Sequence, residues 1–152
     1  MADDLSALED WAGALLAKLE PKARRQLNQG LARELRHGQQ QRIAAQRNPD
    51  GTPFAPRKPR EPLRGKAGRI KRRAMFAKLR QARHLKLQSD AGRIAIGFLG
   101  RTARLARVHQ YGLRDRPGRG ASEVQYARRQ LLGLTAADLE LIRDRLLDHL
   151  AD

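Results

Sequence analysis

Residues 39–60 read QQQRIAAQRNPDGTPFAPRKPR, and this stretch decides how the chain is organised. A basic run rich in helix-forming residues meets Asn-Pro-Asp-Gly at 48–51, which is the composition of a type I turn. Because the residue before a proline is pushed out of the α region, a helix should end near Arg47. The prolines that follow predict an extended basic arm over residues 48–66, which projects from a rigid helix onto a neighbouring molecule.

The arm and the segment after it contain two sets of candidate contact residues. The partner-binding set in the arm is Asn48, Pro49, Asp50, Gly51, Phe54, Arg57, Lys58 and Arg60. The second set, a basic face, is Arg69, Lys71, Arg72 and Arg73. Positive charge at this density suits either the phosphates of a nucleic acid or the acidic surface of another protein.

The charge of the whole chain is divided unevenly. Its 152 residues hold 32 Lys/Arg and 16 Asp/Glu, a net charge of +16. Residues 1–20 have one Lys against five acids (−4), residues 21–120 have 27 Lys/Arg against five acids (+22), and residues 121–152 have four Arg against six acids (−2). A basic middle between acidic ends can bind a polyanion, an acidic protein surface, or the termini of a neighbouring subunit.

Composition also limits the class of protein. A chain of 152 residues fits a single domain, residues 1–152, and the absence of cysteine excludes disulfides and thiolate metal sites. The start shows no basic segment followed by an apolar one, and no apolar run approaches the length of a membrane span. We therefore expect a soluble protein made in a cytoplasm.

Apolar spacing predicts helices at both ends of the chain. Residues 5–19 and 21–47 have leucines at steps of three and four, and Pro21 separates the two helices. The arginines of the second helix, Arg42 among them, are expected on faces other than the apolar one. A last helix follows Thr135 in a capping box, and its expected buried face is Leu139, Ile142, Leu146 and Leu150.

The middle of the chain predicts a shorter helix and a small sheet. A helix is expected between about 66 and 82. Residues 85–88 and 93–98 then alternate apolar with polar or small residues around a Ser-Asp-Ala-Gly turn, which predicts a β-hairpin.

Another short helix is expected from Ala103 to about Gln110, capped by Thr102 and ended by Gly112. A basic, flexible loop should follow over 113–121, and 124–126 is a possible short strand. The whole pattern predicts an α+β domain, with helices at both ends around a small antiparallel sheet.

Residues with catalytic or metal-binding chemistry are scarce. The four histidines are His37, His84, His109 and His149, and none pairs with a second ligand at a metal-binding spacing. Nucleophile-elbow, phosphate-loop and dinucleotide motifs are absent from the sequence. We expect neither an enzyme nor a bound cofactor or metal.

One further motif is Val-His-Gln-Tyr-Gly at 108–112, whose candidate residues are His109, Gln110, Tyr111 and Gly112. Composition favours a local structural role: a core valine, a glycine that ends the helix, and polar side chains that hydrogen-bond nearby.

Taken in order, four motifs resemble the phage virion morphogenesis family, the tail completion proteins of contractile-tailed phages, including Mu-like ones. These motifs are RIAAQ at 42–46 running into NPDGTPF at 48–54, MFAKLR at 75–80, VHQYG at 108–112, and LLGLT at 131–135 before a closing helix. The resemblance spans residues 5–150, and the basic loop 113–120 has no clear counterpart in it.

This resemblance implies a structural protein of the virion or tail particle, assembled in the cytoplasm of a bacterial host. It would cap the head-proximal end of a contractile tail, or serve as the collar of a headless, phage-tail-like bacteriocin (a tailocin). Sixfold tail symmetry implies a homo-hexameric ring that contacts tube, sheath or both, with residues 48–66 as the arm between neighbours. The basic middle would face those proteins or line a channel for DNA.

Two alternatives remain open. The first is a basic nucleic-acid-binding protein whose arm contacts backbone phosphates, with steep salt dependence as its mark. The second is a small adaptor that stays monomeric when it binds another protein.

Overall fold

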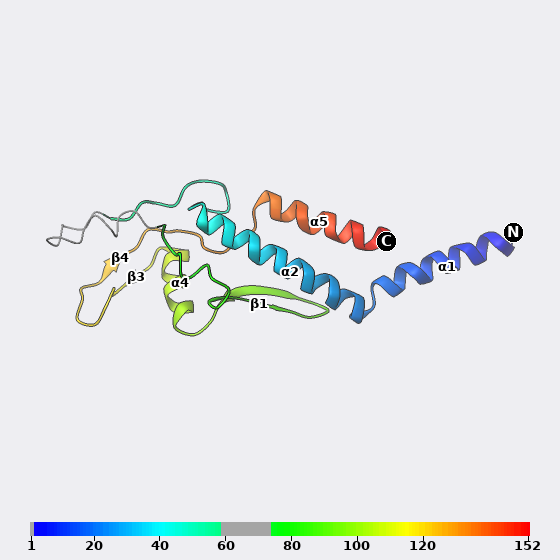
Figure 1. Cartoon of the computed structure of the whole chain (residues 1–152), viewed down its shortest axis with the longest axis horizontal. Coiled ribbons are helices and arrows are strands. Elements are labelled where there is room, and N and C mark those ends of the chain that lie inside the picture. The colour runs from blue at the N-terminus through cyan, green and yellow to red at the C-terminus, as the bar shows by residue number, and fades with distance from the viewer. Residues whose placement is uncertain (1, 59–73) are drawn as a thin grey trace.

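The computed structural model describes residues 2–58 and 74–152, with side chains from Ser6 onward in the first helix. Within these residues the chain forms helices and two separate two-stranded antiparallel sheets, so the expected α+β class is confirmed. The elements are α1 (Ala2–Lys18), α2 (Pro21–Ala44), β1 (Leu85–Ser89), β2 (Ile94–Phe98), α4 (Arg101–Tyr111), β3 (Arg114–Asp115), β4 (Val124–Gln125) and α5 (Ala136–Ala151). Figure 1 shows α5 alongside α2, and α1 extending past both.

Both N-terminal helices end where backbone geometry requires it. Pro21 occupies the first turn of α2, where its missing N–H costs nothing, and Glu20 before it has an extended backbone. At the other end α2 stops at Ala44, slightly earlier than expected, because Gln46 adopts a left-handed φ of 57°. The helix therefore ends before the chain reaches the proline turn at residues 48–51.

The predicted hairpin is confirmed. Strands β1 and β2 pair antiparallel from Leu85↔Phe98 to Ser89↔Ile94. The turn between them is closed by the Asp90 N–H, which donates to the Arg93 carbonyl (2.9 Å), and by the Gly92 N–H, which donates to the Asp90 carboxylate (2.7 Å).

Helix α4 agrees with the expected short helix except at its start. Its N-cap residue is Gly100, while the Thr102 hydroxyl lies inside the first turn and donates to the Leu99 carbonyl (2.7 Å). The expected cap at Thr102 is therefore wrong. At the other end Gly112 is left-handed (φ 63°), and a Cβ there would lie 2.9 Å from the Arg128 nitrogen, so this position requires glycine.

Two expectations for the middle of the chain are corrected. Residues 74–84 form consecutive turns instead of a helix, because Phe76 has a left-handed φ of 65° that a right-handed helix cannot accommodate. The rest of that predicted helix, 66–73, lies outside the described residues. The loop 113–121 is not wholly irregular, because β3 within it pairs with β4, and the strand expected at 124–126 is thereby confirmed.

The core is small and aliphatic. A cluster of buried side chains comes from α2, the turn segments, α4 and the approach to α5: Ile43, Phe54, Leu79, Ala106 and Leu131. Burying a side chain of this size stabilises the fold by about 1.5–3 kcal/mol relative to exposure. Within the predicted arm Phe54 is buried in this core, whereas residues 50–53 and 56–58 are exposed, so the arm is attached to the domain at Phe54. Its remaining residues, 59–66, lie outside the described part of the chain.

The terminal helices bury less than their apolar spacing predicts. Helix α5 has the expected capping box between Thr135 and Asp138. Its expected buried face is only partly confirmed, since Ile142 is half-buried while Leu139, Leu146 and Leu150 are exposed. No described side chain of α1 is buried. The domain therefore leaves a row of apolar side chains in contact with solvent at one end.

Candidate assembly surfaces

The sequence motifs meet at one segment, residues 129–133, which contacts α2, the proline turn and α4 and precedes α5 in the chain. From α2, the Arg42 guanidinium donates to the carbonyls of Gln130 (2.8 Å) and Leu131 (2.7 Å), and also to that of Arg47 (2.9 Å). Arg42 is 9% exposed, so this arginine is buried with the core, although the sequence pattern predicts it on a face other than the apolar one. Burial lowers the pKa of its guanidinium, and the nearby Asp138 carboxylate opposes that shift.

A second side chain of α2 supports Arg42 and the same segment. The Gln39 amide donates to the Gly133 carbonyl (2.8 Å), and its oxygen accepts from the Gly133 N–H (3.3 Å) and from Arg42 (2.6 Å). Because a buried polar group without partners is costly, this network specifies one position for the segment.

The Asn-Pro-Asp-Gly turn binds the segment from another side. The Asn48 side-chain oxygen accepts from the Gln130 N–H (2.9 Å). Pro49 lies so close to Gly133 that a Cβ on the glycine would be 2.4 Å from the proline Cγ. Within the turn, the Asp50 carboxylate accepts from the Thr52 N–H (2.9 Å). Two predicted contact residues of the arm, Asn48 and Pro49, therefore hold the domain together.

Helix α4 provides the third set of contacts through the Val-His-Gln-Tyr-Gly motif. The Gln110 amide donates to the Leu132 carbonyl and its oxygen accepts from the Leu132 N–H, both at 2.9 Å. The His109 carbonyl accepts from the Arg129 N–H (2.7 Å). Tyr111, by contrast, is 62% exposed and available to a partner. The structural reading of the motif is confirmed for Val108, which is buried, and for Gly112, which ends the helix. It is wrong for the two polar side chains, because Gln110 bonds a residue 22 positions away and the buried His109 Nδ1 has no hydrogen-bond partner among the described residues.

The His109 ring lies in an aromatic environment. It makes edge contacts with Phe76 (centroids 4.8 Å apart) and Tyr126 (5.0 Å). Burial lowers the pKa of His109 to about 4, and the positive charge of Arg129 adds to the effect. The imidazole is therefore neutral near pH 7, and we assign it a packing role.

The other described contact residues of the predicted set, Gly51, Arg57 and Lys58, are exposed. Lys58 donates to the Gln125 carbonyl (2.8 Å), and the Gly51 N–H donates to the Asn48 carbonyl (2.9 Å). The backbone beside them is bound by Arg129, which donates to the carbonyls of Ala55 (2.7 Å) and Pro56 (2.9 Å). The remaining predicted residues lie outside the described residues: Arg60, Arg69, Lys71, Arg72 and Arg73.

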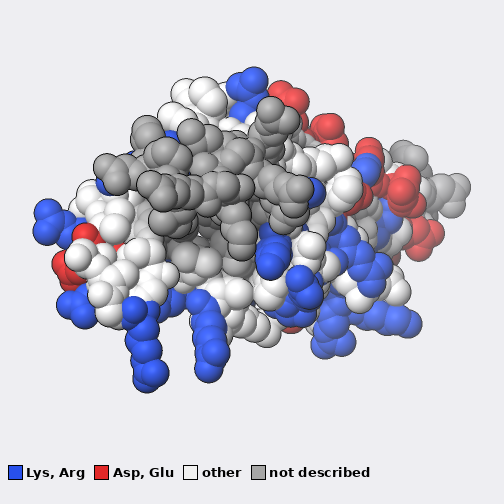
Figure 2. All heavy atoms as spheres, turned by 60° about the vertical axis from the view of Figure 1, so that its left-hand side comes forward, with Lys and Arg blue, Asp and Glu red and all other residues white. Residues whose placement is uncertain are grey.

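Positive side chains cover much of the surface around α4. On the face shown in Figure 2, Lys and Arg project along the lower edge, while acidic side chains gather at the upper right. Exposed arginines follow α4 and the loop after it: Arg101, Arg104, Arg107, Arg114, Arg116 and Arg119. Among them, Arg104 is paired with Asp115 at 2.7 Å. Such a surface attracts an anionic partner through long-range electrostatics.

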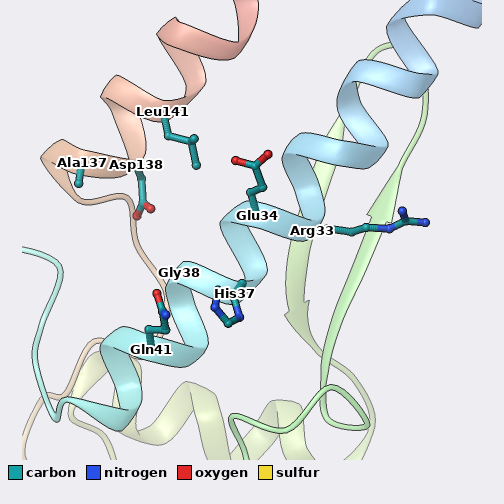
Figure 3. A pocket seen from close by; sticks show the side chains of 8 residues that line it. All are labelled: Arg33, Glu34, His37, Gly38, Gln41, Ala137, Asp138 and Leu141. Carbon is teal, nitrogen blue, oxygen red and sulfur yellow. The ribbon is translucent and has the colours of Figure 1, made fainter.

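A shallow groove runs between α2 and α5 (Figure 3). Leu141 and Glu34 point into the space between the helices, whereas Arg33 points away from α5. Both carboxylates of the groove already have partners, because Glu34 binds Arg145 (3.0 Å) and Asp138 caps α5. This arrangement suits packing against another surface better than acid–base chemistry.

Over residues 2–58 and 74–152, no group of three or more His, Cys, Asp or Glu side chains could hold a metal ion. Nor is any helix of that part of the chain long and apolar enough to cross a membrane.

Sequence reasoning missed three buried polar residues, Gln39, Arg42 and Arg129. A signal for the first two exists, since they continue the apolar row of α2 at helical spacing after Leu35 and alongside Ile43. No comparable periodicity marks Arg129.

Comparison with known proteins places these observations in context. Residues 3–151 match the model of the phage virion morphogenesis family. The chain is 38% identical over 149 residues to the tail completion protein S of Escherichia phage P2, a match that covers 97% of this chain and 98% of the relative. No solved structure gives a significant match.

Proposed function

The chain belongs to the phage virion morphogenesis family, and from that premise we propose that it is a tail completion protein, a structural and non-catalytic component of a phage tail. The observation that carries the proposal is its 38% identity to a protein named for tail completion, over nearly the full length of both chains. In this role it caps the head-proximal end of a contractile tail, so that tube and sheath stop growing.

The polar junction around residues 129–133 supports a scaffolding role. It binds side chains from α2, the proline turn and α4 to one backbone segment, with the guanidinium of Arg42 at its centre. These buried hydrogen bonds fix a single arrangement of the elements around them, although the Arg42 Nε has no hydrogen-bond partner among the described residues. A subunit that must repeat identically around a tail axis benefits from that rigidity.

The surface supports a role in assembly. A net charge of +16 and the exposed arginines around α4 suit a partner with an acidic surface, for which tube and sheath proteins are the proposed candidates. Sixfold symmetry of the tail favours a closed ring of six copies, in which each subunit uses one surface to bind the next.

The experiment that tests this function is the native mass of the purified protein, alone and with its tail tube protein, at moderate salt. We expect a mass of six subunits, either free or bound to the tube. A protein that stays monomeric and does not bind the tube at any concentration would refute the proposed function.

A second candidate function rests on the same positive surface. Exposed arginines near α4 could neutralise phosphates of DNA in the channel of a tail, or of DNA in general. Binding of this kind loses affinity steeply as salt rises and shows little preference for sequence. A gel-shift titration with unrelated DNA duplexes at two salt concentrations separates this candidate from binding to tail proteins.

A further inference from the structure

Helix α1 exposes an apolar stripe that the described part of the chain covers only in part, since Ala12 and Leu15 on it are half-buried. Its large side chains are Leu8 (57% exposed), Trp11 (63%), Leu16 (65%) and, just beyond its end, Leu19 (48%). At 100° per residue these positions share one side of the helix. A lone helix of 17 residues is marginally stable in water, so a stripe of this size indicates a missing partner surface.

Helix α1 is attached to its own domain near one end. Only two residues, Leu19 and Glu20, separate α1 from α2. The end of α1 is held to the end of α5 by hydrogen bonds between Lys18 and the Leu150 carbonyl (3.3 Å) and between His149 and the Lys18 carbonyl (2.8 Å). From this attachment α1 points away from the domain (Figure 1). In this orientation α1 does not lie over its own α5.

A complementary apolar surface exists on α5. Leu139 (52% exposed), Leu146 (44%) and Leu150 (39%) lie on one side of this helix, and Leu147 (58%) lies next to them. These side chains have the spacing of a buried face, yet in a single chain they remain open to solvent. Each subunit therefore offers both an unpaired apolar helix and an unpaired apolar row.

The charges of the helices favour a contact between α1 of one copy and the α2–α5 pair of another. Helix α1 has one Lys against four acids (−3), whereas α2, which lies beside α5, has six Lys/Arg against one Glu (+5). Of these six, Arg42 is buried and Arg33 points away from α5, so the charge open to a partner is mainly that of Lys22, Arg24 and Arg25 in its first turns. Helix α5 itself has two Arg against four acids (−2), so the complementary charge for α1 comes from α2. An acidic helix on the leucines of α5 would have the basic helix as its neighbour.

We propose that α1 of one copy packs its apolar stripe on the exposed leucines of α5 of a second copy, with its acidic side toward α2. The contact joins two different surfaces, so it repeats head to tail and closes into a ring when the rotation allows. This proposal deepens the proposed function. It depends on that function only for the closure of the subunits into a ring.

The single tryptophan of the chain lies on the stripe and reports on it directly. We expect the fluorescence of Trp11 to shift to shorter wavelength as protein concentration rises, in step with the native mass. For the variant Leu16→Glu, the protein concentration at which the fluorescence and the native mass change should rise at least about tenfold, because a carboxylate would be buried at the contact. Leu99→Glu is the matched control, since Leu99 is 64% exposed and lies outside α1 and α5.

Cysteine cross-linking tests which surfaces meet, because the natural chain has no cysteine. Mixing one protein with Ala12→Cys and another with Leu146→Cys under oxidising conditions should give a disulfide-linked heterodimer, since both sites are near the middle of their helices. A Leu99→Cys protein in place of the second should give little product.

Three outcomes would overturn the proposal. The first is a ring that forms equally well with Leu16→Glu while Trp11 stays exposed, and the proposed function would survive that result. The second is a Trp11 shift that appears only when a tail protein is added, which would identify a different occupant of the stripe. The third is a persistent monomer, and if it also fails to bind the tube, the proposed function fails too. Unchanged far-ultraviolet circular dichroism of each variant confirms that its fold is intact.

Discussion

Replacing Arg42 by methionine should destabilise the domain strongly, because three backbone carbonyls and the Gln39 side chain depend on its guanidinium. Each buried carbonyl left without a donor costs about 1–3 kcal/mol. Loss of the charge recovers several kcal/mol of desolvation, which offsets part of that cost. We expect a net loss of about 3–5 kcal/mol in the free energy of unfolding, since three carbonyls lose their donor.

Urea unfolding followed by circular dichroism measures this loss by linear extrapolation. For a chain of this size the loss corresponds to a decrease of about 6–20 °C in Tm. Arg42→Lys keeps the charge but not the forked geometry, so it should be intermediate. Arg33→Met on the exposed side of the same helix is the control and should change stability by no more than about 0.5 kcal/mol. If Arg42→Met costs no more than that control, the junction does not hold the domain together.

Three other predictions concern the same domain. Gly133→Ala should cost about 1–3 kcal/mol in urea unfolding, because its Cβ would lie 2.4 Å from Pro49, while Gly118→Ala in open space should cost less than 0.5 kcal/mol, about the size of ordinary surface changes. His109, whose pKa falls from 6.5 to about 4 on folding, binds its proton first in the unfolded chain. Stability should therefore be full above pH 6.5 and decline by on the order of 2–3 kcal/mol as pH falls toward 4, and His109→Phe should lack that part of the decline. Thr135→Ala should cost about 1 kcal/mol by removing the cap of α5, and an unchanged urea midpoint would contradict it.

Elements with strong local signals could be predicted from the sequence. The hairpin at 85–98, the glycine that ends α4 and the capping box of α5 each depend on residues near one another in the chain. Periodicity also identified the two N-terminal helices. Local signals failed at Phe76, because its left-handed backbone is set by packing of its ring against Phe54 and His109, which are distant in sequence.

The polar junction could be predicted only in part. The proline turn and the Val-His-Gln-Tyr-Gly motif were recognised as significant, but the turn was interpreted as the root of a free arm. In the structure the turn is part of the polar junction, because Asn48 and Pro49 contact residues 130–133, more than 80 positions away in the chain. The spacing of residues along the sequence does not show which distant residues contact each other.

The exposed leucines of α1 and α5 show the converse case. Their spacing predicts burial, and within one chain they are not buried. Apolar residues at helical spacing predict that one face of the helix is buried, but they do not predict which molecule buries it. Among the described residues the mismatch falls on both terminal helices, which is where a partner subunit is proposed to bind.

The most direct test of a tail completion role is cryo-electron microscopy of assembled tails that contain this chain with a small tag. We predict density for six copies, closed into a ring at the head-proximal end and nowhere else along the tail. Tails that reach normal length and end normally without the chain, or a tag spread along the tube, would contradict that role.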